Sequence, residues 1–374
     1  MRQVLLSLGV LMGVMALIQL GCRSTTTSQK FGLKRLDLQI NPEDLGVLNS
    51  QLFLKTAVPG RLTAQDQLFE ISVSYAGKST LTHQKRNFQL TFKEPTHLTP
   101  AKPIELRLAS QSSDPSGLRS LVGFHIFREH GLMTPFIEPV VLYLNGDFQG
   151  LYYTIDNVSE EWIEGQGGQV RSLYKAKFGR LGFGSLDPST LLNLPEAFSV
   201  KSSHKSYTDL ERFVIAVGEP TLGPLDAQLE VDTYLRYLSA AVFLNHWDGY
   251  QNNYFFYKDQ LSGKFIIIPW DLDKIFPSDP PLFESKVMFE QNQVAIRLFE
   301  DDGLRQRYLD HLNVLLETYD EAAMTSLIEG YASRIREAYE HDRYFNPRGV
   351  GMEPAVERLK ASYRYWHSSL AASL

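Results

Sequence analysis

The segment 246–273 holds the residues of this chain that are best suited to chemistry at a phosphate or a metal ion. Asp248 is followed five positions later by Asn253, and two apolar runs then lead to Asp271. A carboxylate can accept a proton from an attacking hydroxyl, whereas an asparagine oxygen and a second carboxylate suit Mg²⁺. A β-hairpin between Asn253 and Asp271 would return the second carboxylate to the first. One short segment would therefore bring three oxygen ligands together.

The order of these parts is that of a kinase catalytic loop followed by its metal-binding aspartate. A structural turn is the alternative, because Asp and Asn are common in loops, where their side chains cap turns and helices. Trp247 and Trp270 flank the acidic residues, and the apolar run 266–268 leads straight into Pro269. Asp271 is thus expected at the end of a buried strand, where a carboxylate without a cation would be costly. The residues alone leave both interpretations open.

Five separated segments carry a resemblance to a known family. They are 85–92 (KRNFQLTF), 113–119 (SDPSGLR), 143–152 (YLNGDFQGLY), 173–175 (LYK) and 246–273. In this order they resemble the CotH kinase family, the spore coat protein H type of atypical protein kinases, over roughly Phe69 to Pro277. The resemblance implies an α+β, two-lobed atypical protein-kinase-like fold with a β-rich N-terminal part and a helical C-terminal part.

The same resemblance implies a reaction. It is the transfer of the γ-phosphoryl group of ATP to a Ser or Thr hydroxyl, with Mg²⁺, or alternatively Mn²⁺, as the metal. Asp248 takes the place of the catalytic base. Asn253, Asp271 and Asp273 take the places of metal ligands.

Residues 139–152 are predicted to form a β-hairpin, because Asn145-Gly146 is a strong two-residue turn signal. In a kinase-like fold a hairpin covers the phosphates, and its glycines let backbone N–H groups approach them. The resemblance therefore implies nucleotide contacts at Asn145, Gly146 and Gly150. Without the resemblance, an ordinary hairpin is the better interpretation.

Lys175 is the residue that the resemblance assigns to phosphate contact and catalysis, at the end of a predicted strand. The family usually has a Glu soon after the Gly-Leu-Tyr segment to hold such a lysine, and this chain has Asp156 at that place. We expect Asp156 to pair with Lys175, although its side chain is one methylene shorter. Glu160 is a neighbour that could substitute for it.

Hydrophobic periodicity predicts the elements that position these residues. Apolar alternation predicts strands at 35–40, 69–75 and 88–92. Helical spacing predicts helices over 118–130, 226–245, 304–318, 324–339 and 354–370. The second of these helices should be mostly buried and deliver His246 into the catalytic loop, where we expect a packing role for the ring.

Composition sets the outer bounds. A chain of 374 residues with 43% hydrophobic and 12% aromatic residues can bury a sizeable core, which excludes a disordered protein. The formal net charge of −6 gives no broad basic surface, so we expect no nucleic-acid partner.

The N-terminus is typical of a bacterial lipoprotein signal peptide. A positive start is followed by an apolar run over 4–20, then Gly21-Cys22 and a polar stretch. Cleavage before Cys22, the single cysteine, would leave a lipid-modified N-terminus on a membrane-anchored, extracytoplasmic protein of the bacterial cell envelope. The alternative is an uncleaved membrane anchor, and Gln19 stands where the lipoprotein signal prefers Leu.

These patterns predict four regions. They are a signal peptide at 1–21, a polar tether at 22–32, a CotH kinase-like domain at 33–300 with its β-rich part at 33–100, and a helical extension at 301–374. The expected partners are ATP, a protein substrate outside the cytoplasm, and the membrane through Cys22.

Two other functions stay open. The first is a catalytically weak or inactive surface protein that serves as a binding module, because ATP is scarce outside the cytoplasm. The second is a metal-dependent transferase of another type, because Asp-x-Asp also binds the metal of nucleotide sugars.

Overall fold

The computed structural model describes residues 28–177, 191, 193–250, 252–277 and 293–374. The predicted signal peptide and Cys22 lie outside these residues. Of the helices within the described part, none is both long and apolar enough to cross a membrane.

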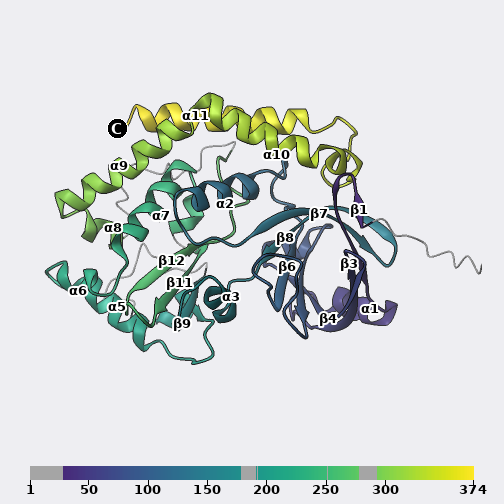
Figure 1. Ribbon diagram of the computed structural model, residues 1–374, viewed down its shortest axis with the longest axis horizontal. Coiled ribbons are helices and arrows are strands. Elements are labelled where there is room, and N and C mark those ends of the chain that lie inside the picture. The colour runs from purple at the N-terminus through teal and green to yellow at the C-terminus, as the bar shows by residue number, and fades with distance from the viewer. Residues whose placement is uncertain (1–27, 178–190, 192, 251, 278–292) are drawn as a thin grey trace, which may run out of the picture.

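The N-terminal part forms a closed β-barrel (Figure 1, right). Its strands are β1 (Gln29–Lys30), β2 (Leu33–Gln39), β3 (Val58–Ala64), β4 (Gln67–Ala76), β5 (Asn87–Phe92), β6 (Glu105–Ala109), β7 (Ile137–Leu144) and β8 (Asp147–Asp156). The neighbouring strands run β1-β2-β3-β4-β5-β6-β8-β7, and a parallel pairing of β2 with β7 closes the sheet. The β-rich part thus runs to Asp156, past the expected limit at residue 100.

Alternation of side chains fills the barrel. Leu36 and Leu38 of β2 are at most 1% exposed and point into the interior, whereas Asp37 between them lies on the other face. Helix α1 (Pro42–Ser50) follows β2, and the Asn41 side chain caps it by accepting a hydrogen bond from the N–H of Glu43. The strands predicted at 35–40, 69–75 and 88–92 are confirmed as β2, β4 and β5.

The predicted hairpin is confirmed as β7–β8. Asn145 and Gly146 both have positive φ, +52° and +89°, as a type I′ turn requires. Leu144 pairs with Asp147 across this two-residue turn.

The rest of the chain surrounds a second, four-stranded sheet (Figure 1, left of centre). Its order is β10 (Phe198–Val200), β9 (Val170–Ala176), β11 (Tyr254–Asp259) and β12 (Phe265–Pro269). The helices of this part are α2 (Arg119–Glu129), α3 (Glu160–Gly165), α4 (Leu194–Ala197), α5 (Thr208–Gly218), α6 (Gly223–Asp226), α7 (Val231–Phe243) and α8 (Gln293–Leu298). The predicted helix at 118–130 is α2, which ends just before Gly131.

Helix α7 begins at Val231 and not at Asp226 as expected. The intervening residues pair with the start of β12: Phe265 N–H donates to Gln228 O over 2.7 Å, and Glu230 N–H donates to Phe265 O over 3.0 Å. This long-range pairing excludes a helical conformation there, so α6 and α7 are separate.

Three long helices complete the chain: α9 (Asp302–Thr318), α10 (Glu321–His341) and α11 (Glu353–Ala371). They confirm the predicted C-terminal helices. Asp301 and Asp320 cap α9 and α10 by accepting backbone hydrogen bonds. Helices α10 and α11 lie along the top of the molecule in Figure 1, and α10 contacts both α2 and the barrel strands β2 and β8. The C-terminal helices therefore brace both parts.

Helix α2 packs closely on the segment that carries Asp271. A Cβ atom at Gly123 would lie 2.9 Å from Leu272 Cδ1 and 3.3 Å from Ile275 Cδ1, and both side chains are fully buried. Only glycine allows this approach, so α2 fixes the position of the aspartate segment.

Replacing Gly123 with Ala should therefore lower the free energy of unfolding by about 1–3 kcal/mol, the usual cost of overpacking. Gly330→Ala in α10 is the matched control, because nothing lies within 4 Å of its Cβ position. That change should stabilise the protein by about 0.5–1 kcal/mol through helix propensity. Urea unfolding of both variants measures the difference, and equal stabilisation by both would contradict close packing at Gly123.

Candidate active site

A buried histidine and a glycine shape the loop after α7. His246 is 1% exposed, and a Cβ atom at Gly249 would lie 2.2 Å from its ring. Burial lowers the pKa of His246 to about 4, so the ring is neutral near pH 7. Tyr237 OH donates to Gly249 O over 2.7 Å and holds the loop on α7. These contacts match the packing role expected for His246.

Two asparagines orient the Asp248 carboxylate. Asn252 Nδ2 donates to Asp248 Oδ1 over 2.8 Å, and Asn253 Nδ2 donates to Asp248 Oδ2 over 3.3 Å. Asp248 is 7% exposed, and burial raises its pKa, which makes the carboxylate a better proton acceptor. Asn253 Nδ2 also donates to Asp271 O over 3.4 Å. The structure thus brings Asp248, Asn253 and Asp271 together, with the amide oxygen of Asn253 left for another ligand.

The hairpin β11–β12 delivers Asp271 to this loop. Tyr254 pairs with Pro269, and Trp270 N–H donates to Asn253 O over 3.1 Å, so the end of β12 lies beside the start of β11. Asp271 has a φ of +61°, a left-handed conformation that side chains other than glycine rarely adopt. Such backbone strain clusters at functional sites.

Asp273 lies half-buried among other carboxylates. Burial raises its pKa to about 8, and the carboxylate of Asp271 acts in the same direction. Within the described residues, no group of three or more His, Cys, Asp or Glu side chains is placed to hold a metal. Two carboxylates and the Asn253 amide nevertheless form an oxygen donor set that fits Mg²⁺, which usually keeps several waters and uses few protein ligands.

Lys175 lies over Trp270, the residue that precedes Asp271. It pairs with Phe255 in the adjacent strand, and its Nζ lies 5.0 Å from the centre of the Trp270 ring and 5.1 Å from that of Phe255. Burial lowers the pKa of Lys175 to about 7; Arg107 adds to the shift, whereas Asp271 opposes it. The charge of Asp271 therefore stabilises the charged form of Lys175.

Asp156 does not pair with Lys175, so that prediction is wrong. Its carboxylate accepts hydrogen bonds from Thr99 Oγ1 at 2.6 Å, Trp162 Nε1 at 3.2 Å and the Phe136 N–H at 3.3 Å. These three neutral donors supply the hydrogen bonds that the buried Asp156 carboxylate needs at the end of β8.

Glu160 does not replace Asp156 as the partner of Lys175. Its two oxygens accept hydrogen bonds from the backbone N–H and the hydroxyl of Ser203.

The β7–β8 turn also differs from expectation. Asn145 Oδ1 accepts from Ile40 N–H at 2.8 Å, and Asn145 Nδ2 donates to Ile40 O at 2.9 Å, which joins the turn to the end of β2. A Cβ atom at Gly150 would lie 2.0 Å from Asp342 Oδ2. Asn145 and Gly150 therefore have structural roles in the barrel in place of the nucleotide contacts expected for them, whereas the contact expected for Gly146 stays a prediction.

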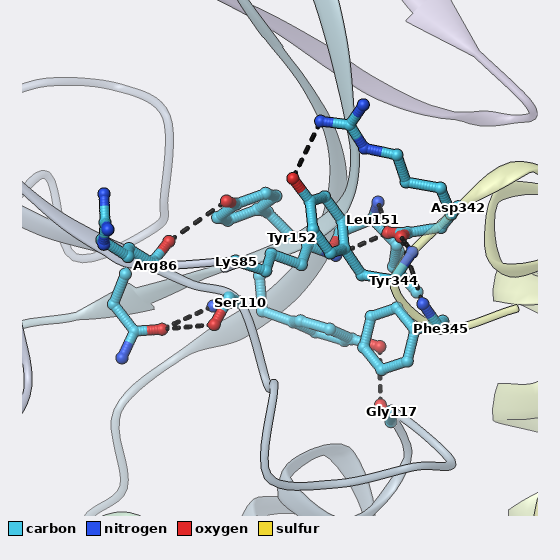
Figure 2. A network of polar contacts seen from close by, with 12 residues as sticks. Lys85, Arg86, Ser110, Gly117, Leu151, Tyr152, Asp342, Tyr344 and Phe345 are labelled. Carbon is cyan, nitrogen blue, oxygen red and sulfur yellow. Dashed lines mark hydrogen bonds and ion pairs between the residues drawn. The ribbon is translucent and has the colours of Figure 1, made fainter. Parts of the chain in front are cut away.

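Asp342 fills the space beside Gly150, and Figure 2 shows the polar contacts of its carboxylate. Lys85 Nζ donates to Asp342 Oδ2 and to Leu151 O, both at 2.5 Å, and the Leu151 N–H donates to the same carboxylate oxygen at 2.8 Å. The side chains of Lys85 and Asp342 are 2% and 0% exposed. Asp342, the residue after α10, therefore joins two of the segments that carry the family resemblance, 85–92 through Lys85 and 143–152 through Leu151.

Sequence reasoning missed the barrel side of the cleft. The residues that line the cleft together with Asp271 and Asp273 include Thr80, Asn87, Arg107, Gln111, Ser112 and Ser120. The guanidinium of Arg107 lies 5.8 Å from the centre of the Trp270 ring. Its only signal in the sequence is a charge between Leu106 and Leu108, which indicates no more than the outer face of a strand.

Comparison with known proteins gives one family and one relative that span most of the chain. The model of the CotH kinase protein family matches residues 73–365. The inner spore coat protein H of Bacillus subtilis (strain 168) is 23% identical over 320 residues, which covers 82% of this chain and 86% of that protein.

Two solved structures are similar at 12% identity. The Helicobacter pylori proinflammatory kinase CtkA has a TM-score of 0.32, and the match covers 77% of this chain and 92% of that one. The Shewanella oneidensis HipA, HipB and operator DNA complex has a TM-score of 0.37, with 72% of this chain and 59% of that one covered. With TM-scores below 0.5, neither similarity establishes the fold.

The family match extends over most of the described part, from β4 into α11, and includes the loop, the hairpin and the aspartates of the cleft. The resemblance stated from the sequence is therefore confirmed, and the chain belongs to the CotH kinase protein family.

Proposed function

We propose that this protein is an atypical protein kinase that transfers the γ-phosphoryl group of ATP to a Ser or Thr hydroxyl of an envelope or secreted protein. The observation that carries the proposal is the convergence of Asp248, Asn253 and Asp271, with Lys175 over the ring of the adjacent Trp270. Membership of the CotH family supports the kinase class.

In this proposal Asp248 removes the proton of the acceptor hydroxyl. The two asparagine amides fix the direction of its carboxylate, and its raised pKa favours proton transfer. The acceptor oxygen then bonds to the γ-phosphorus while the bond from that phosphorus to the bridging oxygen breaks, and ADP leaves. Lys175 holds phosphate oxygens in line with this attack, so the site contributes positioning and charge stabilisation.

Asn253, Asp271 and Asp273 are the residues that would hold Mg²⁺, with Mn²⁺ as the alternative. The bound ion would neutralise phosphate charge. Burial, together with the charge of Asp271, raises the pKa of Asp273 to about 8, and a bound cation would favour the ionised form of both carboxylates.

Calorimetric titration of the purified protein with ATP tests the proposal. We expect ATP to bind in the presence of Mg²⁺ or Mn²⁺ and to bind much more weakly when the metal is removed with a chelator. A preference for a nucleotide sugar over ATP would instead favour the transferase of another type. Absence of nucleotide binding would favour a catalytically inactive binding module.

We further propose that the protein is a lipoprotein anchored to a bacterial membrane through Cys22, because Gly21-Cys22 ends the apolar run. Cys22→Ser should abolish palmitate labelling and leave an unprocessed precursor in the envelope fraction. Ser24→Ala, in the polar stretch that follows, should be processed as the wild type is. If the wild type takes up no label and the Cys22 variant matures normally, the anchor proposal is wrong.

A further inference from the structure

Five cations from separate segments act on one another through their charges. They are Lys55, Lys78, Arg107, Lys175 and Lys201, here called the cation cluster. Arg107 lines the cleft beside Asp271 and Asp273. The positive charges of Arg107, Lys201 and Lys55 act on Lys175, and those of Arg107, Lys78 and Lys201 act on Lys55. The cluster therefore places like charges close together.

No member of the cation cluster forms an ion pair with a carboxylate among the described residues, although the charge of Asp271 acts on Lys175. None of the ion pairs formed by the described residues includes any of the five. By contrast, the buried cations Lys85, Arg119 and Lys258 each contact a carboxylate. Burial and mutual repulsion lower the pKa of Lys55 and Lys175. Arg107 and Lys175 are partly buried, whereas the other three members are exposed. A positive cluster with a partly buried centre is suited to an anion.

The cluster draws on both parts of the molecule. Arg107 extends from β6 of the barrel, whereas Lys175 extends from β9 of the second sheet, and both lie over the ring of Trp270. The hydroxyl residues Thr80 and Ser112 line the same cleft from the barrel side. A guanidinium can bind two phosphate oxygens at once, and an ammonium binds phosphate as a point charge.

We propose that the cation cluster binds the polyphosphate chain of the nucleotide, with Arg107 as the positioning residue that the barrel contributes opposite Lys175. This inference rests on the proposed function, since it names the residues that hold the donor substrate. The ligand is a chain of several phosphates, because that chain is the anionic part of the proposed donor substrate. Binding of such a chain does not itself require transfer, which allows a separate test.

The probe is inorganic tripolyphosphate, titrated by calorimetry into the purified full chain without metal, with orthophosphate for comparison. We expect tripolyphosphate to bind more tightly than orthophosphate and to weaken with rising ionic strength. Arg107→Ala should reduce the affinity for tripolyphosphate and for ATP with Mg²⁺ by about tenfold to a hundredfold, as for loss of one charge-assisted contact. Arg107→Lys should recover part of the loss.

Arg348→Ala is the control, because Arg348 is exposed in the connection between α10 and α11. It should leave both affinities unchanged. Urea unfolding shows whether each variant is folded. If Arg107→Ala does not fold, the affinities of the Arg107→Lys variant are compared with those of the wild type instead.

The inference is overturned if wild type binds no tripolyphosphate, or if folded Arg107 variants bind it and ATP like wild type. A loss confined to the KM for the protein acceptor would also overturn it, because the cluster would then serve the acceptor. If tripolyphosphate binding depends on Arg107 but the protein transfers no phosphate, the inference stands and the kinase proposal is wrong. If the wild type transfers phosphate but the Arg107 variants keep both affinities, the kinase proposal stands and the inference is wrong.

Discussion

Asp248→Asn should reduce phosphoryl transfer by roughly 10²–10⁴-fold, the usual loss when a positioned base is removed, and leave ATP binding nearly intact. Asp271→Asn should reduce both metal-dependent ATP binding and transfer, because it removes a charge from the proposed metal ligands. The difference between the two variants separates a base from a metal ligand.

Calorimetry with ATP and Mg²⁺ gives the binding, and labelled ATP gives the transfer. Asp226→Asn is the matched control, since Asp226 is exposed on α6, and it should change neither quantity. Equal, small effects of the Asp248 and Asp271 substitutions on transfer would contradict both assigned roles.

Asp342→Ala should lower the free energy of unfolding by about 3–5 kcal/mol, because it leaves the Lys85 charge buried without its partner. Burial already lowers the pKa of Lys85 to about 8 although Asp342 acts against this shift. The same substitution removes the acceptor for the backbone N–H groups of Leu151 and Tyr344. The loss should therefore exceed that of an ordinary ion pair.

Chemical unfolding in urea measures this cost. Glu70→Ala is the control, because the ion pair of Arg61 with Glu70 is exposed and such pairs contribute about 0–1 kcal/mol. The double variant Lys85→Met, Asp342→Ala should be more stable than the sum of the two single changes predicts, since contacting residues couple. A loss below about 1 kcal/mol for Asp342→Ala would show that the pair does not anchor the segment after α10 to the barrel.

Local patterns predicted much of the fold and the centre of the site. The Asn145-Gly146 turn and the C-terminal helices follow from turn chemistry and helical spacing within short stretches. Asp248, Asn253 and Asp271 could be grouped because they flank one hairpin, so their proximity needs no distant contact. Lys175 lies in a different strand, and only the family resemblance placed it in the cleft.

What the sequence could not predict depends on distant pairings. Lys85 and Asp342 are 257 positions apart, and no local pattern links them. Asp156 was expected to pair with Lys175. Its carboxylate instead accepts hydrogen bonds from Thr99, Trp162 and Phe136. The start of α7 was misplaced because β12 pairs with the residues before it. Arg107 escaped notice because its role depends on which strands close the barrel.

The central claim is that this cleft transfers phosphate, and incubation of the purified protein with γ-labelled ATP, Mg²⁺ and envelope extract tests it most directly. The account predicts label on Ser or Thr residues of a protein, lost when the metal is chelated or when Asp248→Asn replaces the wild type. Wild-type protein that binds no ATP with either Mg²⁺ or Mn²⁺, and labels no protein, would contradict it.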